Sequence, residues 1–208
     1  MKFTVDIISD VVCPWCYVGK RRFENTIKEL TSDEFELKLL PFQLNPDIVE
    51  DSIKLQDYLV AKFGSLESVT AAQDQLEAVA VQEGIKMDFS KIDFAHNTLK
   101  AHALMQSVGS IDDKLKLNEA FMSAYFEHGK NIGSTDLLEQ IAMENGIEFD
   151  PNYNTYQNIE AVKQEELKVK QLGVNAVPSF VINGKYLIQG AQTKESFFQV
   201  FDQIRKEQ

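Results

Sequence analysis

The chain has 208 residues, of which 44% are hydrophobic, so it is long enough for one globular domain or for one domain with a large insertion. Its 32 acidic and 21 basic side chains give a formal net charge of −11, and no basic run with interleaved aromatic residues stands out. This composition argues against nucleic acid and anionic membranes as partners.

The first residues pass directly into an expected strand. Phe3–Ile8 is short, apolar and rich in β-branched residues, which is typical of a buried strand. The sequence has no charged segment followed by an apolar stretch and a cleavage site, as in a signal peptide. It also has no apolar run of the length needed to cross a membrane. We therefore expect a cytoplasmic protein.

The two cysteines of the chain, Cys13 and Cys16, lie at the start of an expected helix. Pro14 suits the first helical position, where a missing N–H costs nothing. Cys13 then occupies the N-cap, where the positive end of the helix dipole favours the thiolate and allows attack at neutral pH. Cys16 lies one turn further on, sheltered but close enough to form a disulfide with Cys13. The pattern predicts a reversible dithiol–disulfide pair with Cys13 as the exposed thiol.

A zinc site and a structural disulfide are the alternatives for this pair. Zinc needs a second pair of ligands, and the remaining candidates are His96, His102 and His128, which have no cysteine partners. A disulfide that closes so small a loop restrains little of the unfolded chain. In the cytosol, where thiols are kept reduced, a lone pair of this kind is more often catalytic. We therefore favour redox chemistry and expect no metal and no cofactor.

After the first helix, the pattern changes twice. Phe35–Pro41 alternates apolar and polar residues and stops at a proline, which predicts a second strand. From about residue 52 to about residue 146 the periodicity is helical throughout, and five helices are expected. The third of them is expected to include Phe94. Glycines mark the expected stops, at Gly64, Gly84, Gly109, Gly129 and Gly146.

The last part of the chain returns to strands. A long helix is expected to open at Pro151 and to end at Gly173. Asn183–Gly184 lies between two apolar runs and is a strong hairpin signal. Thr193 is placed to cap a final helix. The expected order is therefore β-α-β, a helical segment, and then α-β-β-α.

A strand, a Cys-x-x-Cys pair at a helix start and a later Val-Pro before a hairpin together resemble a thioredoxin fold, and the helical segment resembles its DsbA-type branch. More narrowly, four stretches resemble the FrnE-like group of DsbA-family oxidoreductases: Ser9–Gly19, Pro41–Pro46, Asn97–His102, and Val177–Phe180 with Gly190–Gln192. The resemblance implies an α/β protein with a discontinuous thioredoxin-like domain, residues 1–50 and 150–208. Residues 51–149 would form a helical insertion domain that roofs the redox centre and forms one wall of a cleft.

The resemblance also implies roles for individual residues. Cys13 would be the attacking thiol and Cys16 the resolving one. Val177–Pro178 would be a cis peptide bond that faces the disulfide and leaves the Val177 backbone free to pair with an extended substrate. An ordinary turn proline is the alternative for Pro178. The Pro14-Trp15 pair differs from the Pro-His of periplasmic DsbA, so strong oxidant behaviour does not carry over.

Other candidates have two interpretations each. Trp15, beside Pro14, is either a substrate-facing aromatic or a packing residue. Asn97 and His102 border the cleft in relatives, which makes them candidates for substrate contact, although a histidine satisfied within a helix is the commoner outcome. Asp6 and Asp10 flank the strand position where many relatives bury an acid. Either carboxylate accepts a proton from Cys16 or is simply solvated at the strand end.

These features predict a thiol–disulfide oxidoreductase that acts on protein or small-molecule thiols and disulfides, with glutathione as a candidate, through a mixed disulfide at Cys13. The alternative is a glutathione-dependent isomerase or transferase. The chain also resembles 2-hydroxychromene-2-carboxylate isomerases and kappa-class glutathione transferases, which typically have serine at the first cysteine position. Because this chain keeps both Cys13 and Cys16, the first interpretation is favoured.

Overall fold

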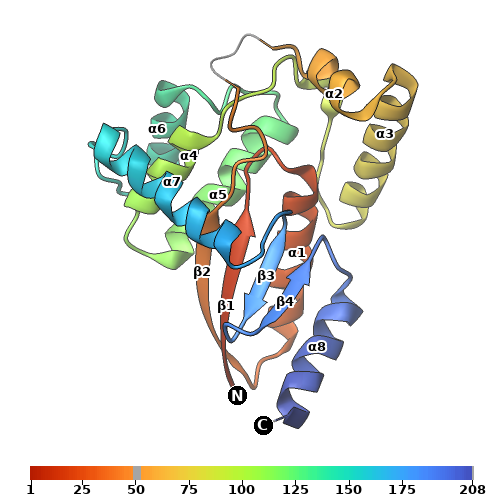
Figure 1. Cartoon of the computed structure of the whole chain (residues 1–208), viewed down its shortest axis with the longest axis vertical. Coiled ribbons are helices and arrows are strands. Elements are labelled where there is room, and N and C mark those ends of the chain that lie inside the picture. The colour runs from red at the N-terminus through yellow and green to blue at the C-terminus, as the bar shows by residue number, and fades with distance from the viewer. Residues whose placement is uncertain (49–52, 208) are drawn as a thin grey trace.

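The computed structural model describes residues 1–48 and 53–207. Its elements, in chain order, are β1 (Lys2–Ser9), α1 (Pro14–Glu29), β2 (Glu34–Pro41), α2 (Leu55–Phe63), α3 (Leu66–Gln82), the 3₁₀ helix η1 (Phe89–Lys91), α4 (Leu99–Ser107), α5 (Ile111–Phe126), α6 (Thr135–Glu144), α7 (Tyr156–Gln171), β3 (Ser179–Ile182), β4 (Tyr186–Gln189) and α8 (Lys194–Glu207). Figure 1 shows their arrangement. The predicted order, β-α-β, then helices, then α-β-β-α, is confirmed.

The four strands form one sheet in the order β2-β1-β3-β4. β1 and β2 run parallel and are joined through α1, whereas β3 and β4 form an antiparallel hairpin beside β1. The parallel register pairs Lys2 with Glu34 and continues to Ser9 with Pro41, so both strands end side by side. The chain segments that follow the two strands therefore emerge next to each other at one edge of the sheet, which is where the cysteines lie.

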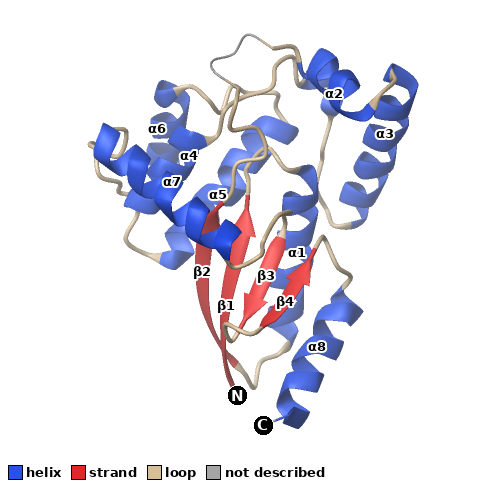
Figure 2. Ribbon diagram, viewed as in Figure 1, coloured by secondary structure: helices blue, strands red, loops and turns tan. Residues whose placement is uncertain are grey.

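Both faces of the sheet are covered by helices (Figure 2). On one face, alternate residues of β1 such as Phe3 and Ile7 form a buried cluster with Phe23 of α1 and Phe201 of α8. On the other face, Ile8 packs with residues of α7 and of the loop after it. This two-sided burial explains why β1 is nearly all apolar, because a strand with helices on both faces has no solvated side.

The helical segment α2–α6 packs over the start of α1. The largest hydrophobic cluster contains both cysteines and Tyr17 together with residues of α5, and the Tyr17 and Phe126 rings stack with centroids 6.2 Å apart. The expectation that the helical segment covers the cysteines is therefore confirmed. No helix within residues 1–48 and 53–207 has the length and apolar character needed to cross a membrane.

Two predicted helix starts were wrong. Phe94 lies outside α4 because it pairs with Lys54 in a β-bridge, and the Asn97 side chain accepts the Leu99 N–H where the helix begins. Pro151 does not open α7 but lies in a turn, in which the Tyr153 N–H donates to the Asp150 carbonyl. In both cases a local polar contact replaces the helical one, which a hydrophobic pattern does not reveal.

The other local predictions are confirmed. Asn183 (φ 52°) and Gly184 (φ 64°) have left-handed backbone conformations in the β3–β4 turn, which suits these two residue types. The Thr193 hydroxyl accepts the Ser196 N–H at 3.3 Å as the cap of α8. The division into residues 1–50 with 150–208 and 51–149 stays a prediction. Helix α7 contacts both α4 of the helical segment and β2 of the sheet.

Candidate active site

The first cysteine lies in a tight turn that opens helix α1. The Cys13 N–H donates to the Asp10 carbonyl at 3.1 Å, and Pro14 takes the first helical position, where it removes no hydrogen bond. Cys13 is the N-cap, and its sulfur accepts the Cys16 N–H at 3.3 Å. An N–H that points at the sulfur from a helix N-terminus stabilises negative charge on it. The N-cap position predicted for Cys13 is therefore confirmed.

The two cysteines are both free and both buried. Cys13 is 3% exposed and Cys16 is 1% exposed, so the expectation that Cys13 is the exposed thiol was wrong. The reason is the cover from distant segments: both residues belong to the cluster formed with the helical segment. On its other side the Cys13 thiol donates to the Val177 carbonyl, with Sγ 3.6 Å from the oxygen.

The environment of Cys16 differs from that of Cys13 in its effect on the sulfur. Burial raises the pKa of the Cys16 thiol well above its usual value, and the neighbouring Cys13 sulfur adds to the rise. The Asp10 main-chain N–H and the Ser9 hydroxyl oppose it in part. Because the rise dominates, Cys16 is a neutral thiol near pH 7 when both cysteines are reduced.

The Val177–Pro178 peptide bond is cis in the structure. The Pro178 ring packs against Gly19 of α1, where an added Cβ would lie 2.8 Å from Pro178 Cγ and 3.2 Å from Ala191 Cα. Three segments far apart in sequence thus meet beside the cysteines. Sequence reasoning gave Gly19 no role, although a glycine inside an otherwise good helix is itself a signal of a close approach.

The remaining candidates lie at different depths. Trp15 is 39% exposed next to Cys13, so much of its ring faces solvent rather than the helical segment. Asn97 begins α4 and its amide lies 3.5 Å from the Pro46 carbonyl. His102 is only 3% exposed. Substrate contacts by Asn97 and His102 stay predictions, and both side chains already have partners within the protein.

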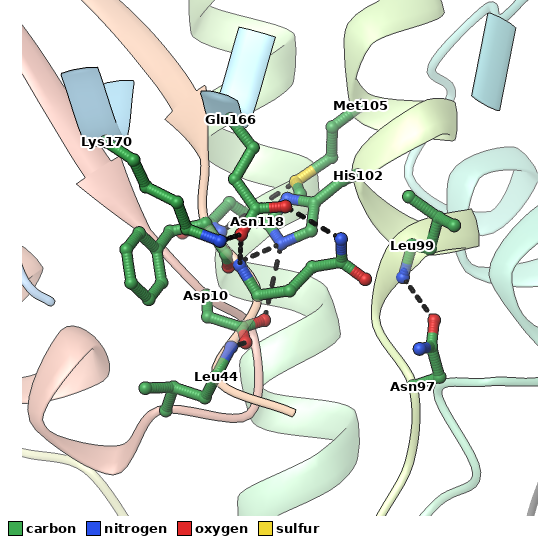
Figure 3. Close-up of polar contacts among 11 residues, drawn as sticks. Asp10, Leu44, Asn97, Leu99, His102, Met105, Asn118, Glu166 and Lys170 are labelled. Carbon is green, nitrogen blue, oxygen red and sulfur yellow. Dashed lines mark hydrogen bonds and ion pairs between the residues drawn. The ribbon is translucent and has the colours of Figure 1, made fainter. Parts of the chain in front are cut away.

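The two aspartates beside the first strand are also in different surroundings. Asp10 is fully buried, so its interpretation as a solvated carboxylate was wrong. It accepts the Leu44 N–H at 2.7 Å and faces His102, whose Nε2 is 3.3 Å away (Figure 3). Asp6 lies within β1 opposite Lys38 of β2, away from the strand end that leads to the cysteines. Burial raises the pKa of Asp6, and Lys38 lowers it in part.

A polar pocket of about 910 Å³ lies between α1 and the helices α3 and α5, and neither cysteine lines it. Its charged residues pair with one another: Lys20 contacts Glu119 at 2.7 Å and Glu24 at 2.8 Å. The pocket is therefore not the cleft that the sequence predicts over the cysteines. Within residues 1–48 and 53–207, no group of three or more His, Cys, Asp and Glu side chains is arranged to hold a metal ion.

Comparisons with known proteins agree with this geometry. A family model described as the DSBA-like thioredoxin domain matches residues 4–201. The chain is 27% identical to the uncharacterized protein YwbO of Bacillus subtilis (strain 168) over 210 residues, which cover 95% of this chain and 94% of that protein.

Among solved structures, the chain is similar to the probable DsbA oxidoreductase SCO1869 of Streptomyces coelicolor, with a TM-score of 0.83 and 28% identity over 99% of this chain and 91% of that one. It also shares its fold with the cytosolic disulfide reductase DsbM of Pseudomonas aeruginosa, which was solved with GSH. That likeness has a TM-score of 0.64 and 14% identity, and it covers 97% of this chain and 99% of that one.

Proposed function

Because the chain belongs to the DSBA-like thioredoxin domain family, we propose that it is a thiol–disulfide oxidoreductase in which Cys13 attacks and Cys16 resolves. One observation supports this proposal above the others. The Cys13 sulfur lies at a helix N-cap with the Cys16 N–H on one side and the Val177 carbonyl on the other. A structural cysteine has no need of an N–H donor aimed at its sulfur.

The reaction proceeds in two exchanges. The Cys13 thiolate attacks a substrate disulfide, a bond forms between Cys13 and one substrate sulfur, and the other substrate sulfur leaves as a thiolate. Cys16 then loses its proton and attacks the Cys13 sulfur, so that the Cys13–Cys16 disulfide forms and the second substrate thiolate departs. The same steps in reverse reduce the protein and oxidise the substrate.

The substrate surface lies beside Cys13. We propose that the Val177 main chain pairs with an extended substrate segment and that Trp15 and Pro14 contact its side chains. The Val177 carbonyl, at 3.6 Å from the Cys13 sulfur, supports this placement, and so does the exposure of Trp15. Pro178, packed on Gly19, keeps the Val177 surface against the helix. Substrates are protein or small-molecule disulfides, and the GSH in the related DsbM structure makes glutathione the first to try.

Single cysteine variants test this function. Reduced protein is mixed with oxidised glutathione, quenched with acid and analysed by intact mass. We expect wild type to end as the internal disulfide, Cys16→Ser to stop as a glutathione adduct on Cys13, and Cys13→Ser to remain largely unreacted. Equal reaction of Cys13→Ser and wild type contradicts the assignment of Cys13 as the attacking thiol.

The same variants separate this function from a glutathione-dependent isomerase or transferase. Such an enzyme activates an external thiol and needs no resolving cysteine. It would keep its activity when Cys16 is replaced by serine, whereas an oxidoreductase of the proposed kind loses turnover. The presence of cysteine at both positions favours the oxidoreductase.

A further inference from the structure

Two buried ionisable side chains, Asp10 and His102, lie behind the cysteines, and the two exchanges described above do not use them. Asp10 is fully buried and His102 is 3% exposed. One Asp10 oxygen accepts the Leu44 N–H at 2.7 Å, and the other lies 3.3 Å from His102 Nε2. The same Nε2 lies 3.1 Å from the Phe42 carbonyl. Since both of its neighbours are acceptors, Nε2 carries a proton and donates to them.

The pair holds the segment Phe42–Leu44 that follows β2. In Figure 3, Asp10 lies between His102 and Leu44, with the two donors on either side of its carboxylate. Phe42 and Leu44 belong to the hydrophobic cluster that includes Val177. The Asp10–His102 pair therefore anchors the wall on which the proposed substrate surface rests.

The main chain of Asp10 connects this anchor to the cysteines. Its carbonyl accepts the Cys13 N–H at 3.1 Å and so closes the turn that places Cys13 at the N-cap. Its N–H lies on the Cys16 side, where it opposes the rise in the pKa of that thiol. The two peptide groups of Asp10 thus serve the two cysteines, while its side chain is fixed by a helix 92 residues away in sequence.

We propose that Asp10 and His102 are a positioning pair for the redox centre, which holds the Asp10–Cys13 turn so that Cys16 can attack Cys13 in a mixed disulfide. This inference rests on the proposed function and concerns its second step. In that step the Cys16 sulfur bonds to the Cys13 sulfur, the bond from Cys13 to glutathione breaks, and glutathione leaves as a thiolate. The first attack needs only the Cys13 sulfur and depends less on the turn.

The test measures the two steps separately. Reduced protein is mixed with oxidised glutathione, samples are quenched with acid over time, and intact mass gives the reduced, glutathione-linked and internally oxidised fractions. Asp10→Ala and His102→Leu each remove one side of the pair. We expect resolution to slow by about tenfold, as for loss of one hydrogen bond to a charged group, so that the adduct on Cys13 accumulates. The first attack changes by less than about threefold, because its sulfur keeps the Cys16 N–H.

Conservative variants distinguish positioning from a loss of fold. Asp10→Asn keeps an oxygen for the Leu44 N–H, and His102→Gln keeps an N–H near the position of Nε2. Both are expected to resolve within about threefold of wild type. They also keep the test decisive if Asp10→Ala does not fold. Glu119→Gln is the matched control, because it breaks a buried ion pair with Lys20 on the far side of α1.

Three results overturn the inference. They are resolution at the wild-type rate in His102→Leu, equal slowing in Glu119→Gln, and slowing in His102→Gln as large as in His102→Leu. A wild-type protein that does not react with oxidised glutathione contradicts the proposed function instead. The two failures are therefore distinguishable in one set of measurements.

Discussion

The Pro178 ring lies against Gly19 so closely that a methyl group added to Gly19 would come within 2.8 Å of Pro178 Cγ. Pro178 precedes β3 and Gly19 is in the second turn of α1, so this contact sets how near the Val177 main chain lies to the Cys13 sulfur. The absence of a side chain at residue 19 is thus part of the construction of the candidate site.

Gly19→Ala is expected to destabilise the protein by about 1–3 kcal/mol, as other overpacked sites do, and to slow its reaction with oxidised glutathione. The new methyl group would push Pro178 and Val177 away from α1. Denaturant unfolding and the rate of adduct formation measure the two effects. Gly109→Ala is the control, because a Cβ there meets no atom within 4 Å. Equal effects of both substitutions would contradict the role of the Gly19–Pro178 contact.

The two thiols are expected to differ in alkylation despite their similar burial. In the Cys13→Ser variant, Cys16 has a pKa raised chiefly by burial, so the reactive thiolate is scarce near pH 7 and its alkylation quickens only as the pH rises into the alkaline range. In the Cys16→Ser variant, Cys13 is expected to react faster at pH 7. Iodoacetamide kinetics from pH 6 to pH 10 check both rates. Faster reaction of Cys16 near neutrality would reverse the assignment of attacking and resolving thiols.

Glu119→Gln is expected to lower the free energy of unfolding by about 2 kcal/mol at pH 7, less than for a fully buried pair because the Glu119 side chain is 28% exposed. Burial raises the pKa of Glu119, but Lys20 and Arg21 outweigh it, so the net pKa is lowered. A lowered pKa in the folded state gives stability that is present above the unfolded value of about 4.3 and is lost as the pH falls through the folded value.

The difference in stability between wild type and Glu119→Gln should therefore shrink on acidification. Urea unfolding at pH 7, 5 and 3 measures it. A difference that does not change with pH would show that the Lys20 and Arg21 contacts do not stabilise the Glu119 carboxylate.

Trp15→Ala is expected to weaken the reaction with a peptide disulfide by about tenfold in kcat/KM, because an exposed aromatic beside the reacting sulfur is the kind of residue that dominates binding surfaces. Its effect on oxidised glutathione should be smaller, since a small substrate covers less of the ring. Tyr156→Ala is the control, because Tyr156 is 83% exposed and begins α7 in the helical segment. Equal losses with both substrates would exclude a role for Trp15 in peptide recognition.

The sequence by itself determined the local structure around the cysteines. A β-branched strand, a proline after Cys13 and helical periodicity beyond it predicted the N-cap, because these are properties of neighbouring residues. The same holds for the Asn183–Gly184 turn and the Thr193 cap. The errors at Phe94 and Pro151 arose where local polar contacts compete with a helix.

Only the tertiary structure decided what surrounds the cysteines. Cys13 is buried rather than exposed because Val177, 164 residues away, and the helical segment cover it. Asp10 is a buried anchor because it meets Leu44, 34 residues away, and His102, 92 residues away. Burial and pairing are sums over contacts between distant segments, and hydrophobic periodicity along one segment carries no information about which segment will pack on it. The identity of the reacting residues was therefore readable in the sequence, whereas their environment was set only when the chain folded.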